Sequence, residues 1–438
     1  MNKVNNEPAQ HHNVASTSWF RAAAPYIHAH RGKTFIVSFD GKAIASSNFD
    51  NLIHDLALLN SLGIRLVITF GARSQIEQQC QQQGVTITYQ QGLRVTDNDS
   101  LTVAKTVIGQ LRLEIEAKLS FSLPHTPMAD AKIRCSSGNI VTAKPVGIRQ
   151  GIDFGHTGEV RRIDTDAIEQ QLSLGNIVLL PPLGFSATGE IFNLSAEAIA
   201  TESAIALHAD KLILIGDRYD ELARELTVSE AEMAINTIHC ENHHTLTAAI
   251  KACQGGVQRV HLLDRANDDA LLQELFSRDG AGVLITNSPF ETIRRATIND
   301  VSGILELITP LEQNGLLVKR SRDNLEIEIN HFTVMERDGT VLACAALYPY
   351  PNNHVGELAC LAVAKSYQDF GRGKQLLTAL EQQAKEMDLN ALYVLTTQTA
   401  HWFIEHGFIQ AELTDLPVAK QQLYNYQRNS RVFKKQLA

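Results

Sequence analysis

The sequence predicts an α/β chain of two domains, a first domain with a mostly parallel sheet and a smaller α+β domain after it. The first prediction rests on alternating strand and helix patterns. Residues 34–39 form a β-branched and aromatic run, residues 49–62 carry apolar residues at helical spacing, and residues 65–70 form a second apolar run. Strand, helix and strand in this order predict a βαβ unit with two parallel strands.

The same alternation continues along the first part of the chain. Residues 176–180, 211–215 and 258–263 are apolar runs, each followed by Gly, Pro or Asp and a further helical pattern. The α/β domain is therefore predicted to cover residues 19–288. The polar opening, residues 1–18, is predicted to be a disordered tail.

The pattern changes after residue 290. Residues 331–348 predict two strands joined at an Asp-Gly pair, which is a hairpin signal. Residues 355–363 predict another strand, and residues 371–387 a helix. Residues 291–438 are therefore predicted to form a separate α+β domain.

Composition limits the classes of function. The chain has 438 residues, 44% hydrophobic and 20% charged, which is typical of a folded protein with more than one domain. Its net charge of -9 argues against a nucleic-acid partner, because phosphate neutralisation requires a basic surface. A membrane span or a signal peptide would need an apolar segment that we do not find. Six widely spaced cysteines favour reduced thiols, so a cytoplasmic location is predicted.

A glycine-rich segment in the second domain has the features of a pyrophosphate-binding loop. Gln368, Gly371 and Gly373 lie between the predicted strand and the predicted helix. Glycine allows close backbone approach, and the unpaired amides of a helix N-terminus favour a pyrophosphate. A glycine-rich turn alone is equally compatible with a tight strand-to-helix connection, so the assignment depends on its surroundings.

Those surroundings resemble the GNAT superfamily of N-acetyltransferases. The resemblance extends over the predicted hairpin, the strand at 355–363, the glycine-rich loop and residues 402–408. It implies acetyl-CoA as co-substrate, with the pyrophosphate on the loop and the pantetheine beside a splayed strand. The residues that it places at acetyl-CoA are Leu361, Ala362, Val363, Gln368, Gly371, Arg372 and Gly373.

Acyl transfer to an amine requires a neutral amine, a stabilised oxyanion and a proton for the leaving thiolate. Glu357, a charge inside an apolar run, is the candidate base, either directly or through a water. The alternative is a solvent-facing strand carboxylate. A backbone amide of residues 361–363 is the candidate oxyanion donor. Thr396 is the candidate for the proton relay, although a place in the core explains it equally well.

Both domains together resemble the bacterial N-acetylglutamate synthases, in which an amino-acid-kinase-like domain precedes a GNAT domain. Residues 315–322 and 424–430 carry this closer resemblance. It implies L-glutamate as the acceptor and places Arg320, Arg428 and Ser430 at its site. Two arginines suit an acceptor with two carboxylates, whereas a single arginine is more often a solvated surface charge.

The first domain resembles acetylglutamate kinase, over residues 31–41 and 189–197, which implies a three-layer sandwich. Ser38 stands where active kinases have a lysine. Asp40 and Arg73 replace glycines of two phosphate-binding turns. Phosphoryl transfer depends on positioning and positive charge, so we do not expect kinase activity.

Resemblance to arginine-sensitive relatives implies feedback inhibition by L-arginine. The matching positions are Tyr26, Lys211, His261, Glu274 and Gly280. Glu274 is the carboxylate expected to pair with the guanidinium. The same resemblance implies a homo-oligomer, with a hexamer suspected; the apolar stretch around Trp19 and Phe20 could dock on a neighbouring subunit or pack within its own.

The residues leave three alternatives. An acetyltransferase for another amino acid or amine is opposed by Arg320 and Arg428, and an arginine sensor with a vestigial acetyltransferase domain by Glu357 and the intact loop. An active acetylglutamate kinase is opposed by Ser38. No metal is predicted, because the contiguous histidines of residues 239–244 do not have a closed tetrahedral spacing.

Overall fold

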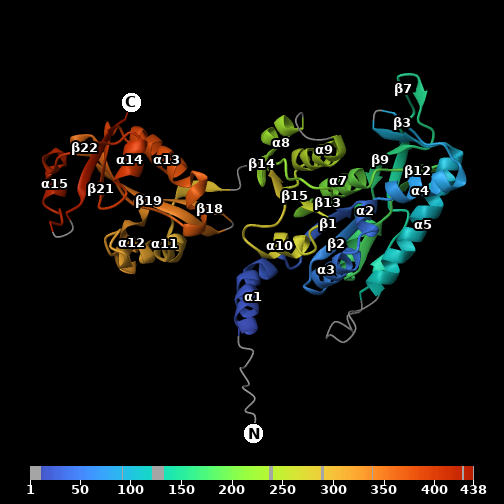
Figure 1. The fold of residues 1–438 in the computed structure, drawn as a ribbon, viewed down its shortest axis with the longest axis horizontal. Coiled ribbons are helices and arrows are strands. Elements are labelled where there is room, and N and C mark those ends of the chain that lie inside the picture. The colour runs from blue at the N-terminus through green and yellow to red at the C-terminus, as the bar shows by residue number, and fades with distance from the viewer. Residues whose placement is uncertain are drawn as a thin grey trace, which may run out of the picture. The chain divides into compact units, whose positions relative to one another are not determined.

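The computed structural model describes residues 11–90, 92–120, 133–235, 240–287, 291–337, 339–426 and 429–437. The chain divides into two compact units, Met1–Pro289 and Phe290–Ala438 (Figure 1). Each unit has its own sheets and its own hydrophobic core.

An eight-stranded sheet forms the centre of the first unit, in the order β14-β16-β15-β13-β1-β2-β10-β5. Neighbouring strands are parallel except for the antiparallel pair β15–β16. The predicted mostly parallel sheet is therefore confirmed. Its strands are β1 (Thr34–Phe39), β2 (Arg65–Phe70), β5 (Cys135–Ser136), β10 (Ile177–Leu180), β13 (Lys211–Gly216), β14 (Glu225–Thr227), β15 (Arg259–Asp264) and β16 (Val283–Thr286).

Helices cover both faces of this sheet, which confirms the three-layer sandwich (Figure 1). Strand β1 explains why: Phe35 and Val37 pack into one core and Ile36 into the other, so each residue of the strand is buried. On the first face lie α1 (His11–His30), α3 (Phe49–Ser61), α4 (Arg73–Gln83), α5 (Asn98–Ser120) and α10 (Ala270–Phe276). On the second lie α6 (Thr165–Ser173), α7 (Ala196–Ala206), α8 (Val228–Ala234) and α9 (Cys240–Gln254).

Smaller elements complete the first unit. A four-stranded sheet has the order β12-β11-β6-β9, and two hairpins pair β3 with β4 and β7 with β8. These elements are α2 (Gly41–Ile44), β3 (Thr88–Gln90), β4 (Leu93–Val95), β6 (Val141–Pro145), β7 (Ile148–Arg149), β8 (Ile152–Asp153), β9 (Gly158–Ile163), β11 (Leu183–Phe185) and β12 (Ile191–Asn193).

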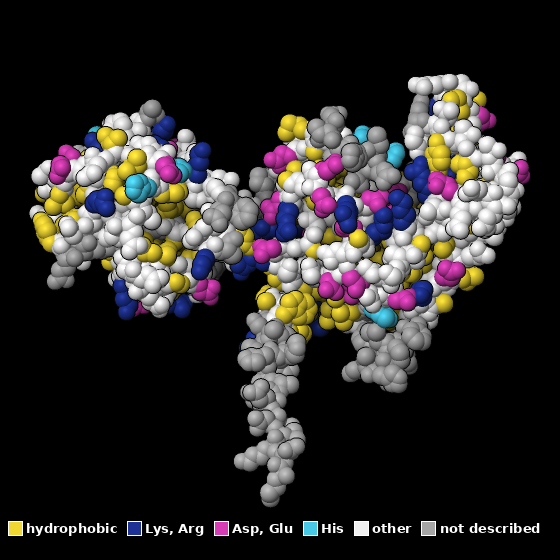
Figure 2. All heavy atoms as spheres, viewed as in Figure 1, with side chains coloured by type: hydrophobic (Ala, Val, Ile, Leu, Met, Phe, Trp, Pro, Cys, Tyr) yellow, Lys and Arg dark blue, Asp and Glu magenta, His cyan; other side chains and the backbone are white. Residues whose placement is uncertain are grey.

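Helix α1 begins at His11, within the segment that we predicted to be a tail. The prediction is wrong for residues 11–18, because a polar composition does not by itself prevent a helix. From residue 19 to residue 30 most side chains of α1 are exposed, and Ala23 and His30 are the two that are buried. Trp19 and Phe20 are about half exposed, and hydrophobic side chains gather beside α1 in Figure 2. Docking of a second subunit there stays a prediction.

The second unit is built on a seven-stranded sheet with the order β17-β18-β19-β20-β21-β23-β22. The predicted hairpin is the antiparallel pair β18–β19, and only β20–β21 among the described pairs of this sheet is parallel. The α+β prediction is therefore confirmed. The strands are β17 (Thr292–Arg295), β18 (Phe332–Arg337), β19 (Thr340–Tyr350), β20 (Val355–Val363), β21 (Ala391–Thr396), β22 (Ile409–Ala411) and β23 (Arg431–Gln436).

Helices cover the two faces of this sheet as well. One core includes residues of α11 (Val301–Gln313) and α12 (Arg322–Glu328), and the other residues of α13 (Arg372–Glu386) and α14 (Ala400–Glu405). The shorter helices are η2 (Ile298–Asp300), η3 (Ile329–His331), η4 (Pro351–Asn353), η5 (Lys365–Phe370), η6 (Leu413–Asp415) and α15 (Val418–Gln421). Among the described residues of the chain, no helix has the length and apolar character needed to cross a membrane.

Candidate functional site

Strands β20 and β21 separate at the centre of the second unit. They pair in parallel only from Val355 to Leu358 of β20, although β20 continues to Val363. Strand β19 pairs with the other edge of β20, with an irregular register near Cys360, whose φ is +54°. Such a bulge bends a strand. The edge of residues 359–363 that turns toward β21 is therefore open to a ligand, which matches the splayed strand that the resemblance implies.

The predicted residues of this edge divide between the two faces. Ala362 is buried in the core with α11 and α12. Leu361 and Val363 are partly buried against the core with α13 and α14. The side chains of these three residues thus pack in the cores and hold the strand in place. Their backbone groups are what a ligand at this edge can contact.

The glycine-rich loop connects this edge to the N-terminus of α13. Gly371 has a φ of +73° and is the N-cap of the helix, and a Cβ built there would have no atom within 4 Å. At Gly373 a Cβ would lie 3.2 Å from Cζ2 of Trp402. Gln368 donates from Nε2 to the carbonyl of Val363 at 3.1 Å. The open space before unpaired helix amides fits an anionic group.

The side chain of Arg372 is engaged within the protein. Its Nε donates to both carboxylate oxygens of Glu291 at 2.9 Å, and its Nη2 also pairs with that carboxylate. The guanidinium lies 4.8 Å from the ring centre of Tyr367. Both charged side chains are largely buried, at 11% and 15% exposure. Arg372 therefore ties the loop to the residue before β17, and its predicted contact with acetyl-CoA stays a prediction.

Glu357, the candidate base, is buried on β20 with 7% exposure. The alternative of a solvent-facing carboxylate is therefore wrong. Its Oε1 lies 2.7 Å from Nζ of Lys420, and its Oε2 accepts a hydrogen bond from Tyr350 at 3.3 Å. Burial and the neighbouring Glu357 charge raise the pKa of Tyr350 to about 12, so the phenol is a donor at neutral pH.

Thr396 is the last residue of β21, two residues beyond Val394, where pairing with β20 ends. It is buried, and its Oγ1 lies 2.8 Å from Oγ1 of Thr399 and accepts from the amide of Thr399 at 3.1 Å. The hydroxyl is thus at the separated ends of the two strands, where a proton relay would be needed.

The predicted acceptor residues come from two other segments. Arg320 follows α11; burial acts to lower its pKa, but the neighbouring Cys360, Tyr348 and Glu328 outweigh burial and raise it. Tyr348 lies opposite Glu357 in the β19–β20 pair and donates to Glu328 at 2.5 Å. Ser430 precedes β23, whose Arg431 pairs with Thr396. Arg428 lies outside the described residues.

The predicted effector residues of the first unit form a buried hydrogen-bonded chain. Lys211 donates to Nε2 of His261 at 3.2 Å, and Nδ1 of His261 donates to Oε1 of Glu274. Oε2 of Glu274 accepts from the amides of Ala281 and Gly282 at 2.6 and 2.9 Å. A Cβ at Gly280, whose φ is +61°, would lie 2.4 Å from that oxygen. The close approach therefore requires glycine at position 280.

The charges of this chain follow from burial and from Lys211. Burial first, and then the Lys211 ammonium, lower the pKa of His261, so its ring is neutral at neutral pH. Burial alone would raise the pKa of Glu274, but the His261 contact and the two amides outweigh it and lower that pKa to about 2. Tyr26 lies next to this chain through His30: the ring centres of Tyr26 and His30 are 6.3 Å apart. His30 in turn donates from Nε2 to the carbonyl of Leu275, the residue after Glu274. The structure thus brings the five predicted positions into one neighbourhood.

Comparison with known proteins gives two family matches, the amino acid kinase family over residues 33–264 and the acetyltransferase (GNAT) family over residues 302–408. The amino-acid acetyltransferase of Pseudomonas putida is 49% identical over 427 residues, which cover 96% of this chain and 99% of the relative. That of Pseudomonas syringae pv. syringae is 48% identical over 95% of this chain and 98% of its own. The chain belongs to the amino-acid acetyltransferase family.

Solved structures agree with this assignment. The N-acetylglutamate synthase of Neisseria gonorrhoeae, complexed with coenzyme A and L-arginine, matches this chain with a TM-score of 0.88 and 38% identity. The match covers 96% of this chain and 99% of the synthase. The same protein complexed with coenzyme A and N-acetyl-glutamate matches with a TM-score of 0.61 over the same shares. The resemblance predicted for both domains is confirmed, and the chain is an enzyme of the acyltransferase class.

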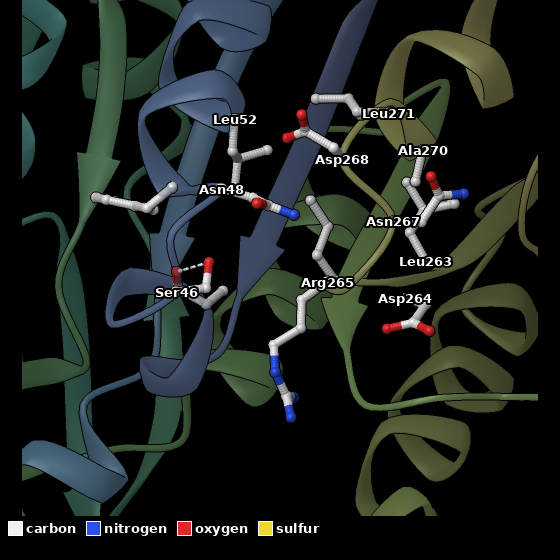
Figure 3. A pocket seen from close by; sticks show the side chains of 13 residues that line it. Ser46, Asn48, Leu52, Leu263, Asp264, Arg265, Asn267, Asp268, Ala270 and Leu271 are labelled. Atoms are coloured by element: carbon white, nitrogen blue, oxygen red, sulfur yellow. Dashed lines mark hydrogen bonds between the residues drawn. The ribbon is translucent and has the colours of Figure 1, made fainter.

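The first unit of this chain has ion pairs at the carboxyl ends of its central strands. Arg265 donates to Asp40 at 2.9 Å and also pairs with Asp217, which accepts from Lys42 at 3.3 Å. The adjacent cavity, between Asn48 and Arg265 in Figure 3, has a volume of about 30 Å³. The lack of kinase activity stays a prediction.

Sequence reasoning missed three residues that the geometry brings to these sites: Tyr350 and Lys420 at Glu357, and Glu291 at Arg372. Lys420 lies on the four-residue helix α15, which has no motif and no periodicity of its own. Tyr350 was detectable, because a two-residue spacing from Tyr348 places both on one face of β19. Among the described residues no cluster of three or more His, Cys, Asp or Glu suited to a metal ion occurs.

Proposed function

We propose that this enzyme transfers the acetyl group of acetyl-CoA to the α-amino group of L-glutamate, the first step of arginine biosynthesis, in the cytoplasm. The similarity over 96% of the chain to a protein crystallised with coenzyme A and N-acetyl-glutamate carries the proposal. The buried Glu357 beside an open strand edge supports it, because an amine acceptor needs a base there.

In the proposed reaction the pyrophosphate of acetyl-CoA binds at Gly371 and Gly373, and the pantetheine lies along the open edge of β20. Glu357 removes a proton from the acceptor ammonium, directly or through a water. The free amine attacks the thioester carbonyl, whose oxygen accepts from a backbone amide of residues 361–363. The carbon–nitrogen bond forms, the carbon–sulfur bond breaks, and Thr396 relays the excess proton of the attacking nitrogen to the CoA thiolate.

We further propose that L-arginine inhibits the enzyme by binding at Glu274. The two lone-pair positions of Oε2 are used by the amides of Ala281 and Gly282, whereas Oε1 contacts one side chain, His261, among the described residues. A carboxylate has about four acceptor positions. Oε1 can therefore accept one further hydrogen bond from a guanidinium.

The decisive experiment measures release of the CoA thiol with glutamate, glutamine, aspartate or ornithine, with and without L-arginine. Selective turnover of glutamate that decreases with arginine is the expected result. Turnover of another acceptor would contradict the assigned substrate. Absence of turnover with all four, together with arginine binding, would favour an arginine sensor with a vestigial acetyltransferase domain.

A Gly371→Val substitution is expected to raise KM for acetyl-CoA on the order of tenfold, because the side chain would occupy the space before the helix amides. The φ of +73° adds a folding cost of about 1–2 kcal/mol. Gly84→Val is the matched control, since Gly84 has a φ of +70° and equally open surroundings. An unchanged KM in Gly371→Val would contradict the assigned pyrophosphate loop.

A Glu291→Gln substitution is expected to raise KM for acetyl-CoA by roughly 3- to 10-fold, because Arg372 loses the charge that holds the loop. The KM for the acceptor should stay the same. Glu381→Gln, which removes the half-buried carboxylate partner of Lys435 elsewhere on α13, controls for loss of an ion pair. Equal effects of the two variants on KM would show that the Glu291 pair has no particular connection to acetyl-CoA.

A further inference from the structure

The carboxylate of Glu357, the candidate base, is paired with Lys420 in the enzyme without substrate. Nζ of Lys420 lies 2.7 Å from Oε1 of Glu357, and the two side chains are 21% and 10% exposed. Tyr350 occupies the second oxygen at 3.3 Å. Both oxygens of the candidate base therefore have partners before any acceptor arrives.

The position of Lys420 is set by its neighbours on α15. Nε2 of Gln421 donates to the carbonyls of Thr414 and Leu416 at 3.1 and 2.7 Å, which fixes the short helix beside the end of η6. The side chain of Lys420 then spans from this helix to β20. This side chain can change its partner easily, because a lysine ammonium lies at the end of four flexible methylenes and lacks the rigid, planar donor geometry of an arginine.

An ammonium substrate at Oε1 of Glu357 would share that oxygen with Lys420 and place two cations beside one largely buried carboxylate, which is unfavourable. Displacing the lysine without a new partner would leave a cation in a site that is largely closed to water, which is unfavourable. An amino acid solves both problems, since it brings an ammonium for Glu357 and, two bonds away, a carboxylate for Lys420. One ion pair of the free enzyme is then replaced by two, and each charge keeps a partner.

We propose that Lys420 is a specificity-determining residue that exchanges partners when the acceptor binds, releasing Glu357 to the α-ammonium group and taking the α-carboxylate. The α-carboxylate is the nearer of the two carboxylates of glutamate to the ammonium, and thus to Lys420. The exchange selects acceptors that carry a carboxylate beside the amine and excludes simple amines. This inference rests on the proposed acetylation of glutamate.

The test compares L-glutamate with its α-amide, isoglutamine, which keeps the amine and the side-chain carboxylate. In Lys420→Met, kcat/KM for glutamate is expected to fall on the order of 10- to 100-fold. With isoglutamine it should change by less than about threefold, because that acceptor offers Lys420 no carboxylate. Lys420→Arg should keep most of the discrimination. Lys385→Met, at an exposed position on the last turn of α13, is the matched control.

An equal decrease with both acceptors in Lys420→Met would overturn the proposal, because Lys420 would then only position Glu357. Calorimetric titration of glutamate into each protein with CoA present tests the same point without turnover. Lys420→Met should weaken glutamate binding while the melting temperature shows a folded protein, and unchanged binding would overturn the proposal. If the wild-type enzyme does not acetylate glutamate, the proposed function fails; the comparison is then made with the amino acid it does acetylate and that acceptor's α-amide.

Discussion

Replacement of Glu357 by glutamine is expected to decrease kcat for glutamate acetylation on the order of 10²- to 10⁴-fold, the usual contribution of a general base. The amide keeps the shape of the side chain and can still accept from Tyr350, but it cannot take a proton from the acceptor. The KM for acetyl-CoA should stay within about twofold, because the loop at Gly371 is not touched. Steady-state kinetics with both substrates varied measures kcat and the KM for acetyl-CoA separately.

Two further variants make this prediction specific. Glu357→Asp keeps the carboxylate and should retain more activity than Glu357→Gln, with a loss caused by the longer distance to the acceptor. Glu326→Gln removes a carboxylate from an exposed pair with Arg322 on α12 and should leave kcat unchanged. Glu357→Gln with wild-type kcat would assign the proton transfer to another group and would also remove the basis for partner exchange at Lys420.

The parts of the fold that could be predicted are those in which one segment carries the whole pattern. β1 and β2 are buried on both faces, so their apolar runs are unbroken and distinct from the helix between them. The small sheet was missed because β11 and β12 have three residues each, too few to establish an alternation. Short strands of this kind are stabilised by their neighbours in space, which a local pattern does not contain.

The candidate site divides in the same way. The loop with Gly371 and Gly373 is a contiguous motif, and Glu357 is conspicuous as a charge within an apolar strand. By contrast, Lys420 lies 63 residues from Glu357 in the sequence (420 − 357 = 63) and has no signal that connects the two. The bulge at Cys360, which opens the strand edge, is a backbone property with a residue type that does not favour a positive φ.

The buried chain in the first unit predicts a loss of stability in acid. The pKa of Glu274 is about 2 in the folded protein against 4.5 for the ordinary group, a difference of about 3 kcal/mol in favour of folding. This stability is present above pH 4.5 and is lost as the pH falls toward 2. Burial lowers the pKa of His30 to about 4, so the unfolded chain binds that proton first and acidification below 6.5 is also destabilising. Both groups act in the same direction.

Glu274→Gln is therefore expected to have two effects, of which only one concerns the effector. The amide cannot accept from His261, Ala281 and Gly282 as the carboxylate does, so the free energy of unfolding should fall by about 2–3 kcal/mol at pH 7, as measured by thermal or urea unfolding. The variant should also show a flatter dependence of stability on pH between 4.5 and 2.

The effect on arginine is what tests the proposed effector site. Saturating L-arginine should raise the melting temperature of the wild-type enzyme, since a ligand at about 100 times its Kd stabilises the bound state by about 2.7 kcal/mol. In Glu274→Gln this increase and the inhibition of turnover should both disappear, because the guanidinium loses its carboxylate partner. Glu169→Gln, at an exposed position on α6, should keep both responses. A variant that lost stability but still responded to arginine would show that Glu274 holds the loop of Gly280 and that the guanidinium binds elsewhere.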